Sequence, residues 1–343
     1  MSAKSTPYIS SSERSAFRSC RYRWYWLYMR RLKSKTNAPP LRFGSLIHKA
    51  FEGYYKPGIK RGPSPTLLFE KAYESELKEQ SAIGFRDEDG TWNDAGELGV
   101  AMLDSYVNTY GKDDEWEVLA TEQRFEAPIK SSRGTVLGWY VGVIDLIMKH
   151  RPTKSIELWD HKGVKSIDTG YLTLDSQKSG YWTYGVDALI ASGVIKSTLG
   201  LRTMRYNFLR KAKPDEREFR VGEKGQKIYL NQNGTDSKVQ PSAHFVRHPV
   251  PMTDAERGLE REMVLGELRD MTLVKAGKLT IYKNPGKFTC MFCDVKDICE
   301  IHQVGGDHEE MARLMLVPKR KWTPLAYKEE AIEHEIEDKM TGG

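Results

Sequence analysis

The sequence predicts an α/β fold, and three observations lead to this fold class. The segments GWYVGVIDLIMKH (138–150) and IELWDHKGV (156–164) have the composition of strands, and the turn-like RPTKS joins them as in a β-hairpin. A further strand is predicted at 201–211. Helical patterns occupy 41–55, 173–192 and a segment that ends near 275. Strands that alternate with helices along a chain are typical of the α/β class.

The segment 11–32 is predicted to form an amphipathic helix that Ser11 or Ser12 caps. An inward stripe at helical spacing comprises Phe17, Cys20, Trp24 and Tyr28, and a basic stripe beside it comprises Arg14, Arg18 and Arg21. Core packing with a solvated basic face explains this pattern. The alternative is a channel for a nucleic-acid strand, lined by Arg18, Arg21, Arg23 and Trp26, in which phosphate attraction and base stacking both contribute.

The remaining segments complete the predicted order of elements. A polar, poorly patterned stretch covers 56–95, a helix follows at 96–110, and a strand follows at 115–129. The segment 212–245 is rich in Gly, Asn, Pro and charge and is predicted to be an insertion or a pair of long loops. Thr253 and Glu256 form a capping box before the last long helix.

Composition narrows the classes of function. The chain of 343 residues has a net charge of +6, a mild excess that suits a nucleic-acid partner. Its N-terminus lacks the apolar stretch of a secretory signal, and no apolar stretch is long enough to span a membrane, so a cytoplasmic protein is expected. No P-loop or dinucleotide fingerprint is present, which argues against an intrinsic ATP motor.

Three residues of the predicted hairpin form a candidate catalytic set. Because strand side chains alternate, Asp160 and Lys162 share one face of their strand while His161 points to the other. Asp145 lies on the neighbouring strand. Two carboxylates held together repel unless a hard cation lies between them, and Mg²⁺ accepts such oxygen ligands together with phosphate oxygens and water. The lysine can stabilise charge on a phosphate or orient the attacking water.

The four cysteines predict a bound metal or cluster. Cys290, Cys293 and Cys299 lie close together, whereas Cys20 is far upstream. In a cytoplasmic chain this placement favours ligation over disulfides. Four thiolates could hold zinc or a 4Fe–4S cluster. His302 could substitute as a ligand, although four cysteines already suffice.

These motifs together resemble those of the PD-(D/E)XK nuclease superfamily. GVIDLIMKH followed by IELWDHKGVKS resembles its central motifs. GSLIHKAFE and QKSGY resemble the G-x-x-x-H-x-x-x-E and Q-x-x-x-Y motifs of the RecB-like branch, through residues Gly44, His48, Glu52, Gln177 and Tyr181. The cysteine pattern resembles cluster-bearing members, namely AddB-type recombination nucleases, CRISPR-associated RecB-like exonucleases and phage-encoded relatives. The matching segments span residues 12 to 302.

The resemblance implies a role for each matching residue. His48, Asp145 and Asp160 are expected to ligate a catalytic Mg²⁺ or Mn²⁺, with help from the carbonyl of His161, and Lys162 is the expected catalytic lysine. Gln177 and Tyr181, one helical turn apart, are expected to position the DNA backbone and this lysine. The family often has an aromatic residue at position 161 and Thr at position 163, where this chain has His161 and Gly163. Glu52 and Glu122 also match acidic positions of the family, and a structural or supporting role is expected for both.

The resemblance also implies the fold and the domains. We expect a restriction-endonuclease-like core, a mixed central sheet flanked by helices, at 36–275. A helical subdomain at 1–35 and 276–310 is expected to carry a 4Fe–4S cluster on Cys20, Cys290, Cys293 and Cys299, and thus to tie both chain ends together. The resemblance favours this cluster over zinc. Residues 311–343 are expected to be a charged tail.

The implied function is metal-dependent DNA hydrolysis by an exonuclease that acts in recombination, repair or phage replication. Single-stranded DNA or duplex ends are the expected substrates, and a helicase or a single-strand annealing protein is a candidate partner. Two alternatives stay open. One is a non-catalytic DNA-binding recombination scaffold, and the other is a structure-specific endonuclease.

Overall fold

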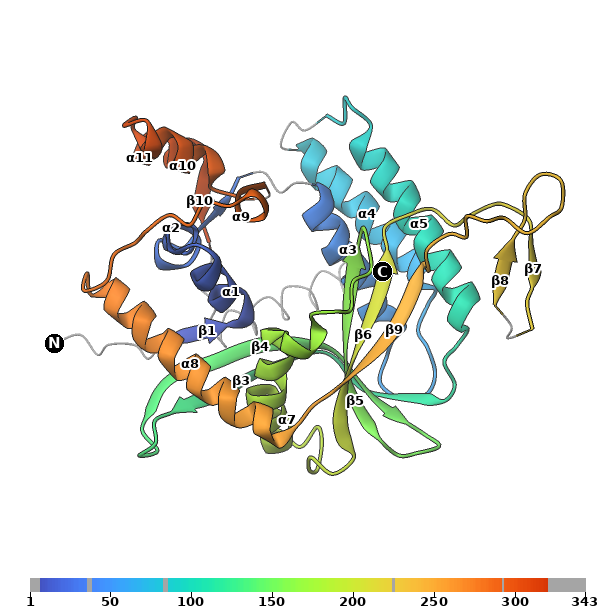
Figure 1. The fold of residues 1–343 in the computed structure, drawn as a ribbon, viewed down its shortest axis with the longest axis horizontal. Helices are drawn as coiled ribbons and strands as arrows, with labels where there is room; N and C mark the ends of the chain where they lie inside the picture. The colour runs from blue at the N-terminus through green and yellow to red at the C-terminus, as the bar shows by residue number, and fades with distance from the viewer. Residues whose placement is uncertain (1–6, 36–38, 83–85, 224–225, 292, 320–343) are drawn as a thin grey trace, which may run out of the picture. The chain divides into compact units, whose positions relative to one another are not determined.

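The computed structural model describes residues 7–35, 39–82, 86–223, 226–291 and 293–319, and it divides the chain into two compact units (Figure 1). Unit 1 comprises Met1–Ser11 and Ala38–Leu265, and unit 2 comprises Ser12–Asn37 and Gly266–Gly343. Each unit is therefore formed by two separate stretches of the chain. Among the described residues, no helix is long and apolar enough to cross a membrane.

Unit 1 contains a mixed central sheet. Its strands run in the order β1-β4-β5-β6-β9, with β3 also paired to β4. The pairs β1/β4 and β5/β6 are parallel, and the other three pairs are antiparallel. The strand bounds are β1 Tyr8–Ser10, β3 Trp116–Lys130, β4 Val136–His150, β5 Ile156–Val164, β6 Leu201–Arg210 and β9 Phe245–Pro251. The predicted hairpin and the predicted strands at 115–129 and 201–211 are confirmed, whereas β1 and β9 were not predicted.

Three helices cover one face of this sheet. They are α3 Pro39–Tyr54, α4 Pro65–Ala82 and α5 Thr91–Tyr110, and they share a buried apolar cluster with Leu146, Trp159 and Leu209 of the sheet. The poorly patterned stretch 56–95, for which no element was predicted, contains α4 and the start of α5. Only Pro65 and Phe69 are buried in α4, so this helix has almost no amphipathic signal in the sequence. Close packing holds it instead, since a Cβ at Gly99 of α5 would lie 2.1 Å from the ring of Phe69.

The opposite face of the sheet carries the segment predicted as a helix at 173–192. It consists of the 3₁₀ turn η2 Leu172–Leu174, the helix α6 Ser176–Gly180, the π-helical turn η3 Tyr181–Gly185 and the helix α7 Val186–Ala191. Successive side chains of β6 point to opposite faces of the sheet. Asn207 contacts Tyr106 of α5, whereas the neighbouring Tyr206 donates a hydrogen bond to Asp175, which caps α6.

Two further predictions concern the segment that follows β6. The predicted insertion contains a small antiparallel pair, β7 Phe219–Val221 and β8 Lys227–Tyr229 (Figure 1). The helix α8 spans Asp254–Lys275, and its capping box is confirmed. The Thr253 backbone N–H donates to Glu256 at 3.2 Å, and the Glu256 N–H donates to the Thr253 hydroxyl at 3.3 Å.

Unit 2 is built from short elements. Its helices include α1 Ser11–Ser19, α2 Arg21–Trp24, the π-helical turn η1 Tyr25–Met29, α9 Lys287–Met291, α10 Lys296–Gln303 and α11 His308–Met315. The strand β2 Leu32–Ser34 pairs with β10 Leu316–Pro318. Residues 311–318 therefore belong to α11 and β10 and not to a charged tail, while 320–343 lie outside the described residues.

The prediction of one continuous helix at 11–32 was wrong. Cys20 has extended backbone angles, φ −162° and ψ 114°, so the helix ends before it and α2 begins after it. The expected basic stripe is also not free. Arg14 is fully buried and pairs with Glu267, Arg18 and Arg21 lie 3.6 Å from Glu267 and Asp270, and Arg23 lies 2.8 Å from Asp294. Trp26 is fully buried, so it cannot line a strand channel.

Candidate active site

The site lies where two strands of the hairpin separate. Pairing of β4 with β5 extends from Lys149↔Ile156 to Leu146↔Trp159 and stops there. The next residues on the two strands are Asp145 and Asp160. From this point β5 continues beside β6 alone. The separation of the strands opens a gap between them, and this gap lets the two carboxylates approach one another.

Asp145 is held in this gap by the backbone of the neighbouring strand. Its Oδ2 accepts a hydrogen bond of 2.7 Å from the N–H of His161. Burial raises the pKa of Asp145 to about 7, and the charge of Asp160 adds to the increase. A buried carboxylate beside a second carboxylate favours a bound cation, because the cation stabilises both charged forms.

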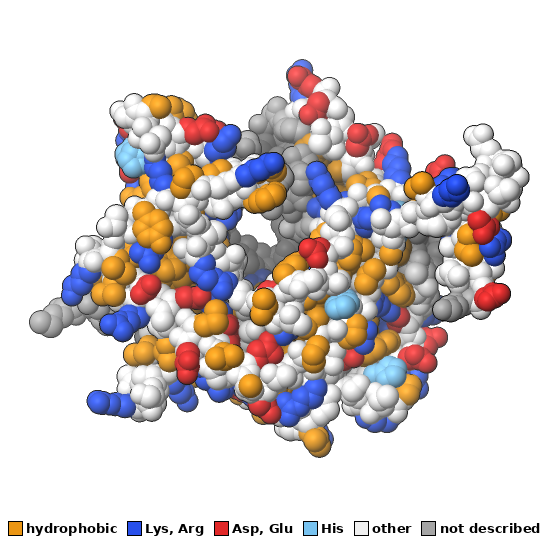
Figure 2. Space-filling view, in the orientation of Figure 1, with side chains coloured by type: hydrophobic (Ala, Val, Ile, Leu, Met, Phe, Trp, Pro, Cys, Tyr) orange, Lys and Arg blue, Asp and Glu red, His pale blue; other side chains and the backbone are white. Residues whose placement is uncertain are grey.

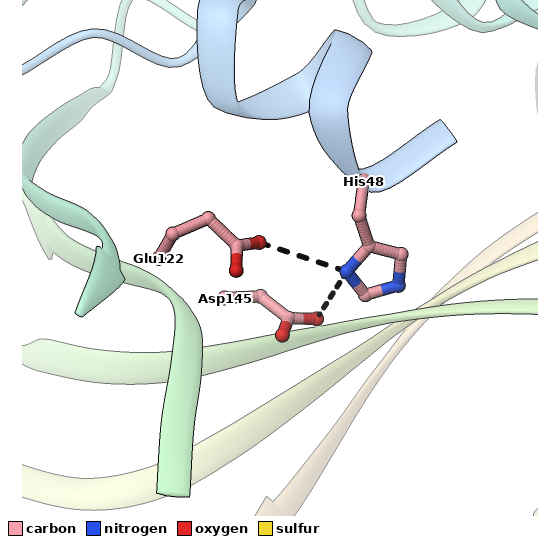
Figure 3. A group of neighbouring side chains, drawn as sticks. All are labelled: His48, Glu122 and Asp145. Carbon is pink, nitrogen blue, oxygen red and sulfur yellow. Dashed lines mark ion pairs between the residues drawn. The ribbon is translucent and has the colours of Figure 1, made fainter. Parts of the chain in front are cut away.

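His48 reaches the same gap from α3. Its Nε2 lies 3.0 Å from the carbonyl oxygen of His161, and its Nδ1 lies 3.5 Å from Asp145 and 3.7 Å from Glu122 (Figure 3). Burial alone would lower the pKa of His48. The hydrogen bond to Glu122 and the charges of Asp145 and Asp160 outweigh burial and raise this pKa to about 9. The imidazole therefore lies among acidic groups, as a metal-binding histidine does.

Glu122 is the residue whose role the sequence reasoning underestimated. The register of β3 with β4 runs from Thr121↔Leu146 to Gln123↔Ile144, so Glu122 lies opposite Asp145. Its φ of +42° is in the left-handed region, which side chains other than glycine adopt only at a cost in energy. His48, Glu122 and Asp145 offer ligand atoms that all lie within 4.8 Å of one another. This strain coincides with a candidate metal site, and no sequence signal reveals it.

Asp160 and Lys162 form an ion pair beside this group. The lysine Nζ lies 2.7 Å from Asp160 Oδ2, as expected for alternate residues of one strand. Asp160 lies outside the group of three candidate ligands; its Oδ2 pairs with Lys162, and its Oδ1 accepts a hydrogen bond from the amide of Gln177. Burial would lower the pKa of Lys162, but the charge and hydrogen bond of Asp160 raise it. The lysine is therefore held in its charged form.

Gln177 joins the separate parts of the site. Its side-chain oxygen accepts a hydrogen bond of 2.9 Å from Lys162, and its amide nitrogen lies 2.9 Å from Asp160 and from the Tyr181 hydroxyl. Tyr181 in turn donates to the carbonyl of Val143 at 2.6 Å. Burial raises the pKa of Tyr181 well above its ordinary value, so the phenol stays neutral. The expected helical pair thus lies next to the lysine, one turn apart on the same face.

The ring of His161 packs against Phe51 of α3 and Tyr55 just after this helix, on the face of β5 opposite to Asp160 and Lys162, as alternation along the strand predicts. Its Nδ1 lies 2.8 Å from the amide nitrogen of Asn207, which also donates to the Tyr106 hydroxyl at 3.0 Å. Burial lowers the pKa of His161 well below its ordinary value, so the ring is neutral. Arg247 and Asp113 extend these contacts, with nitrogen to oxygen distances of 2.6 Å between them. A buried polar network therefore fixes the residue whose peptide contacts both His48 and Asp145.

Two other expected residues lie outside the convergent group. Glu52 is exposed on α3, consistent with the supporting role expected for it. Gly44 lies on the same helix, and a Cβ there would meet nothing within 4 Å, so no close approach requires a glycine at this position. Of the residues that match the G-x-x-x-H-x-x-x-E motif, His48 therefore belongs to the convergent group, and Gly44 and Glu52 do not.

The four cysteines all belong to the described part of unit 2. Cys20 precedes α2, Cys290 lies in α9, Cys293 follows it and Cys299 lies in α10, and each thiol is free and half-buried. Cys20, Cys293 and Cys299 pack on one apolar cluster. Burial raises the pKa of the Cys299 thiol, and the charges of Cys20 and Cys290 add to the increase. Among the described residues, no cysteine joins a group of three ligand atoms within 4.8 Å.

One comparison with known proteins shows the family of this chain. A family model described as the PD-(D/E)XK nuclease superfamily matches residues 8–300, so the chain belongs to this superfamily. The name of this family describes its members as nucleases.

The fold of the chain is also similar to that of a solved structure. The chain is similar to a "putative exonuclease" from Eubacterium rectale, with a TM-score of 0.43 and 12% sequence identity over 85% of this chain and 88% of that chain. No curated protein sequence is significantly similar to this chain.

Proposed function

We propose that this protein is a metal-dependent DNA nuclease of the RecB-like branch, and that it hydrolyses phosphodiesters. One observation carries the proposal. Ligand atoms of His48, Glu122 and Asp145 converge within 4.8 Å, next to a lysine that pairs with Asp160 at 2.7 Å. Such a donor set of one imidazole and several carboxylates suits Mg²⁺ or Mn²⁺.

We propose that His48, Asp145 and Asp160 hold the metal, with Glu122 as an additional ligand. A bound divalent cation would neutralise phosphate charge and lower the pKa of a water molecule. Asp160 lies within electrostatic range of both His48 and Asp145, since its charge raises the pKa of each. The left-handed backbone of Glu122 supports its inclusion, because strained residues cluster at functional sites.

The other site residues position the substrate and the lysine. Lys162 carries a positive charge at the edge of the metal group, where it can stabilise the charge that develops on the phosphate. Gln177 holds this lysine and Asp160 together at 2.9 Å from each. Tyr181 fixes Gln177 through its neutral hydroxyl. The contacts of Lys162, Gln177 and Tyr181 support these three proposed roles.

We propose that the cysteines bind a 4Fe–4S cluster in a subdomain formed by residues 1–35 and 276–310, next to a nuclease core at 36–275. Support comes from their placement. Four free thiols from distant parts of the chain share one unit, and a backbone N–H at Asn284 lies 3.5 Å from the Cys20 sulfur. Zinc is the alternative occupant, and metal analysis of the purified protein separates the two.

The proposed substrate is DNA with a free end, single-stranded or duplex, so the activity is that of an exonuclease in recombination, repair or phage replication. A helicase or an annealing protein is the proposed partner, and the host cytoplasm is the proposed location. On the face shown in Figure 2, basic and acidic side chains are interspersed. Binding of DNA on this face must therefore depend on local groups rather than on a broad basic surface.

The test uses end-labelled linear and closed circular DNA, each single- and double-stranded, with Mg²⁺ or Mn²⁺. We expect degradation of linear DNA that stops when EDTA is added. Full activity after exhaustive chelation would contradict the catalytic assignment. Cleavage of closed circles would favour a structure-specific endonuclease, and binding without cleavage would favour a non-catalytic scaffold.

A further inference from the structure

The loop between β5 and α6 exposes two large apolar side chains at the candidate active site. Tyr171 is 51% exposed and Leu174 is 86% exposed, whereas Leu172, which lies in the same 3₁₀ turn, is 1% exposed. Isolated exposed apolar residues are common on protein surfaces. Here, however, the two exposed side chains lie on one short turn, directly before the helix that carries Gln177.

Three contacts anchor this turn. Leu172 is buried, and the carbonyl of Thr173 accepts a hydrogen bond of 3.1 Å from the buried Lys178. Asp175 caps α6 and also accepts a hydrogen bond of 2.7 Å from Tyr206. The turn is therefore held in place on both sides of Leu174. A side chain presented by an anchored turn loses little freedom when it binds a ligand, so exposure of this kind favours binding.

The turn is linked to the candidate catalytic lysine through the start of α6. Asp175, the residue after Leu174, caps this helix, and Gln177 accepts a hydrogen bond of 2.9 Å from Lys162 and lies 2.9 Å from Asp160.

We infer that Tyr171 and Leu174 form a binding subsite for a nucleobase, with Tyr171 stacked on the base and Leu174 packed at its edge. The inference rests on the proposed nuclease function and specifies its substrate. A strand whose phosphate lies at Lys162 brings a base to the same rim, and a lysine near an exposed aromatic ring suits this combination of charge and stacking. Because a paired base cannot expose its face, the subsite selects an unpaired nucleotide next to the cleaved bond.

The test measures binding of single-stranded DNA with Mn²⁺ in the Asp145→Asn background, which is expected to be cleavage-deficient and keeps Lys162. Two oligonucleotides are compared, one with natural bases and one in which the central nucleotides are abasic. The subsite variants are Tyr171→Ala, Tyr171→Phe and Leu174→Ser. Leu199→Ser is the matched control, because Leu199 is 88% exposed on another turn of unit 1.

The parent should bind natural DNA about fivefold or more tightly than abasic DNA, which is the lower range of base stacking on an aromatic side chain. Tyr171→Ala should remove this preference, Tyr171→Phe should keep it, Leu174→Ser should reduce it and Leu199→Ser should leave it unchanged. Equal preference in the parent and in Tyr171→Ala would overturn the subsite while the nuclease proposal stands. If the parent binds neither oligonucleotide, the subsite proposal is wrong, and the cleavage assay with duplex DNA decides the nuclease proposal separately.

Discussion

The two candidate sites of this protein are built in different ways. In unit 1, the sheet and the backbone of His161 hold His48 and Asp145 through contacts of 3.0 and 2.7 Å. Behind them lies an apolar cluster of sixteen buried residues among those the structure describes. In unit 2, three of the four cysteines lie at or in helices of four, five and eight residues. The corresponding cluster there has six buried residues in the described chain.

This difference indicates what each site needs in order to form. Helices of four to eight residues are marginal by themselves, and a small cluster adds little stability. We therefore expect unit 2 to depend on what its thiols bind, whereas the site of unit 1 is formed by the protein alone. Variants in the two units should separate loss of chemistry from loss of stability.

The largest effect on activity is expected from Lys162→Ala. Removal of one preorganised charged group commonly lowers kcat by about 10² to 10³-fold. The melting temperature should change little, because the strands and their hydrogen bonds stay in place. Nuclease assays and a thermal melt check this, with Lys149→Ala as the control on β4, where Lys149 pairs with Glu117 at 3.7 Å. A Lys162→Ala protein that melts far below the control would show that the site of unit 1 also depends on its charges for folding.

Cys20→Ala should affect stability first and activity second. A cluster on all four cysteines would close a loop of about 270 residues, which on the loop-entropy model for cross-links restricts the unfolded chain by roughly 5 kcal/mol. We expect a lower melting temperature, loss of brown colour, loss of most of the roughly four irons per chain, and faster proteolysis of the C-terminal segment.

The matched control for this variant is Ser19→Ala, which removes only a local hydrogen bond of 3.1 Å to the carbonyl of Ala16. If Cys20→Ala melts like this control and keeps its iron, Cys20 is only a core residue. In that case the stability of unit 2 does not depend on a group bound by Cys20. Zinc in place of iron would keep the comparison and change the identity of the bound metal.

The sequence predicted those parts of the site that depend on regular periodicity. Alternation along β5 placed Asp160 beside Lys162, and the helical repeat placed Gln177 beside Tyr181, at 2.7 and 2.9 Å in the structure. Glu122 could not be predicted in this way. Its direction depends on a left-handed φ and on the register between two strands, and neither leaves a pattern in the sequence.

The same limit explains the errors in the fold. The helix α4 buries too few side chains to produce an amphipathic pattern, and the break at Cys20 lies inside a segment whose pattern is helical throughout. In both places tertiary packing decides the local structure. The short strands β1 and β9 were likewise missed, since each is defined by its neighbour in the sheet more than by its own composition.

The smallest of the expected effects, and the most informative about unit 1, concerns Asn207. This fully buried residue contacts His161 Nδ1 at 2.8 Å and the Tyr106 hydroxyl at 3.0 Å. Asn207→Leu should loosen His161, whose peptide contacts both His48 and Asp145. Loss of such a supporting contact typically weakens metal binding by about 10- to 100-fold. We expect the Mn²⁺ concentration that gives half-maximal cleavage to increase about 10-fold, which is the lower end of this range.

Unfolding alone could lower the activity of Asn207→Leu, so the control must also be destabilised. The control is Val250→Ala, which removes buried apolar volume from β9, since Val250 is 1% exposed. Val250 lies opposite Met204 of β6, away from the candidate metal ligands. Both variants are titrated with Mn²⁺ well below their melting temperatures. If the two require the same Mn²⁺ concentration as the parent, the network around His161 supports folding only. If Asn207→Leu alone requires more, the network positions the metal ligands, and unit 1 forms its site through contacts that the protein itself provides.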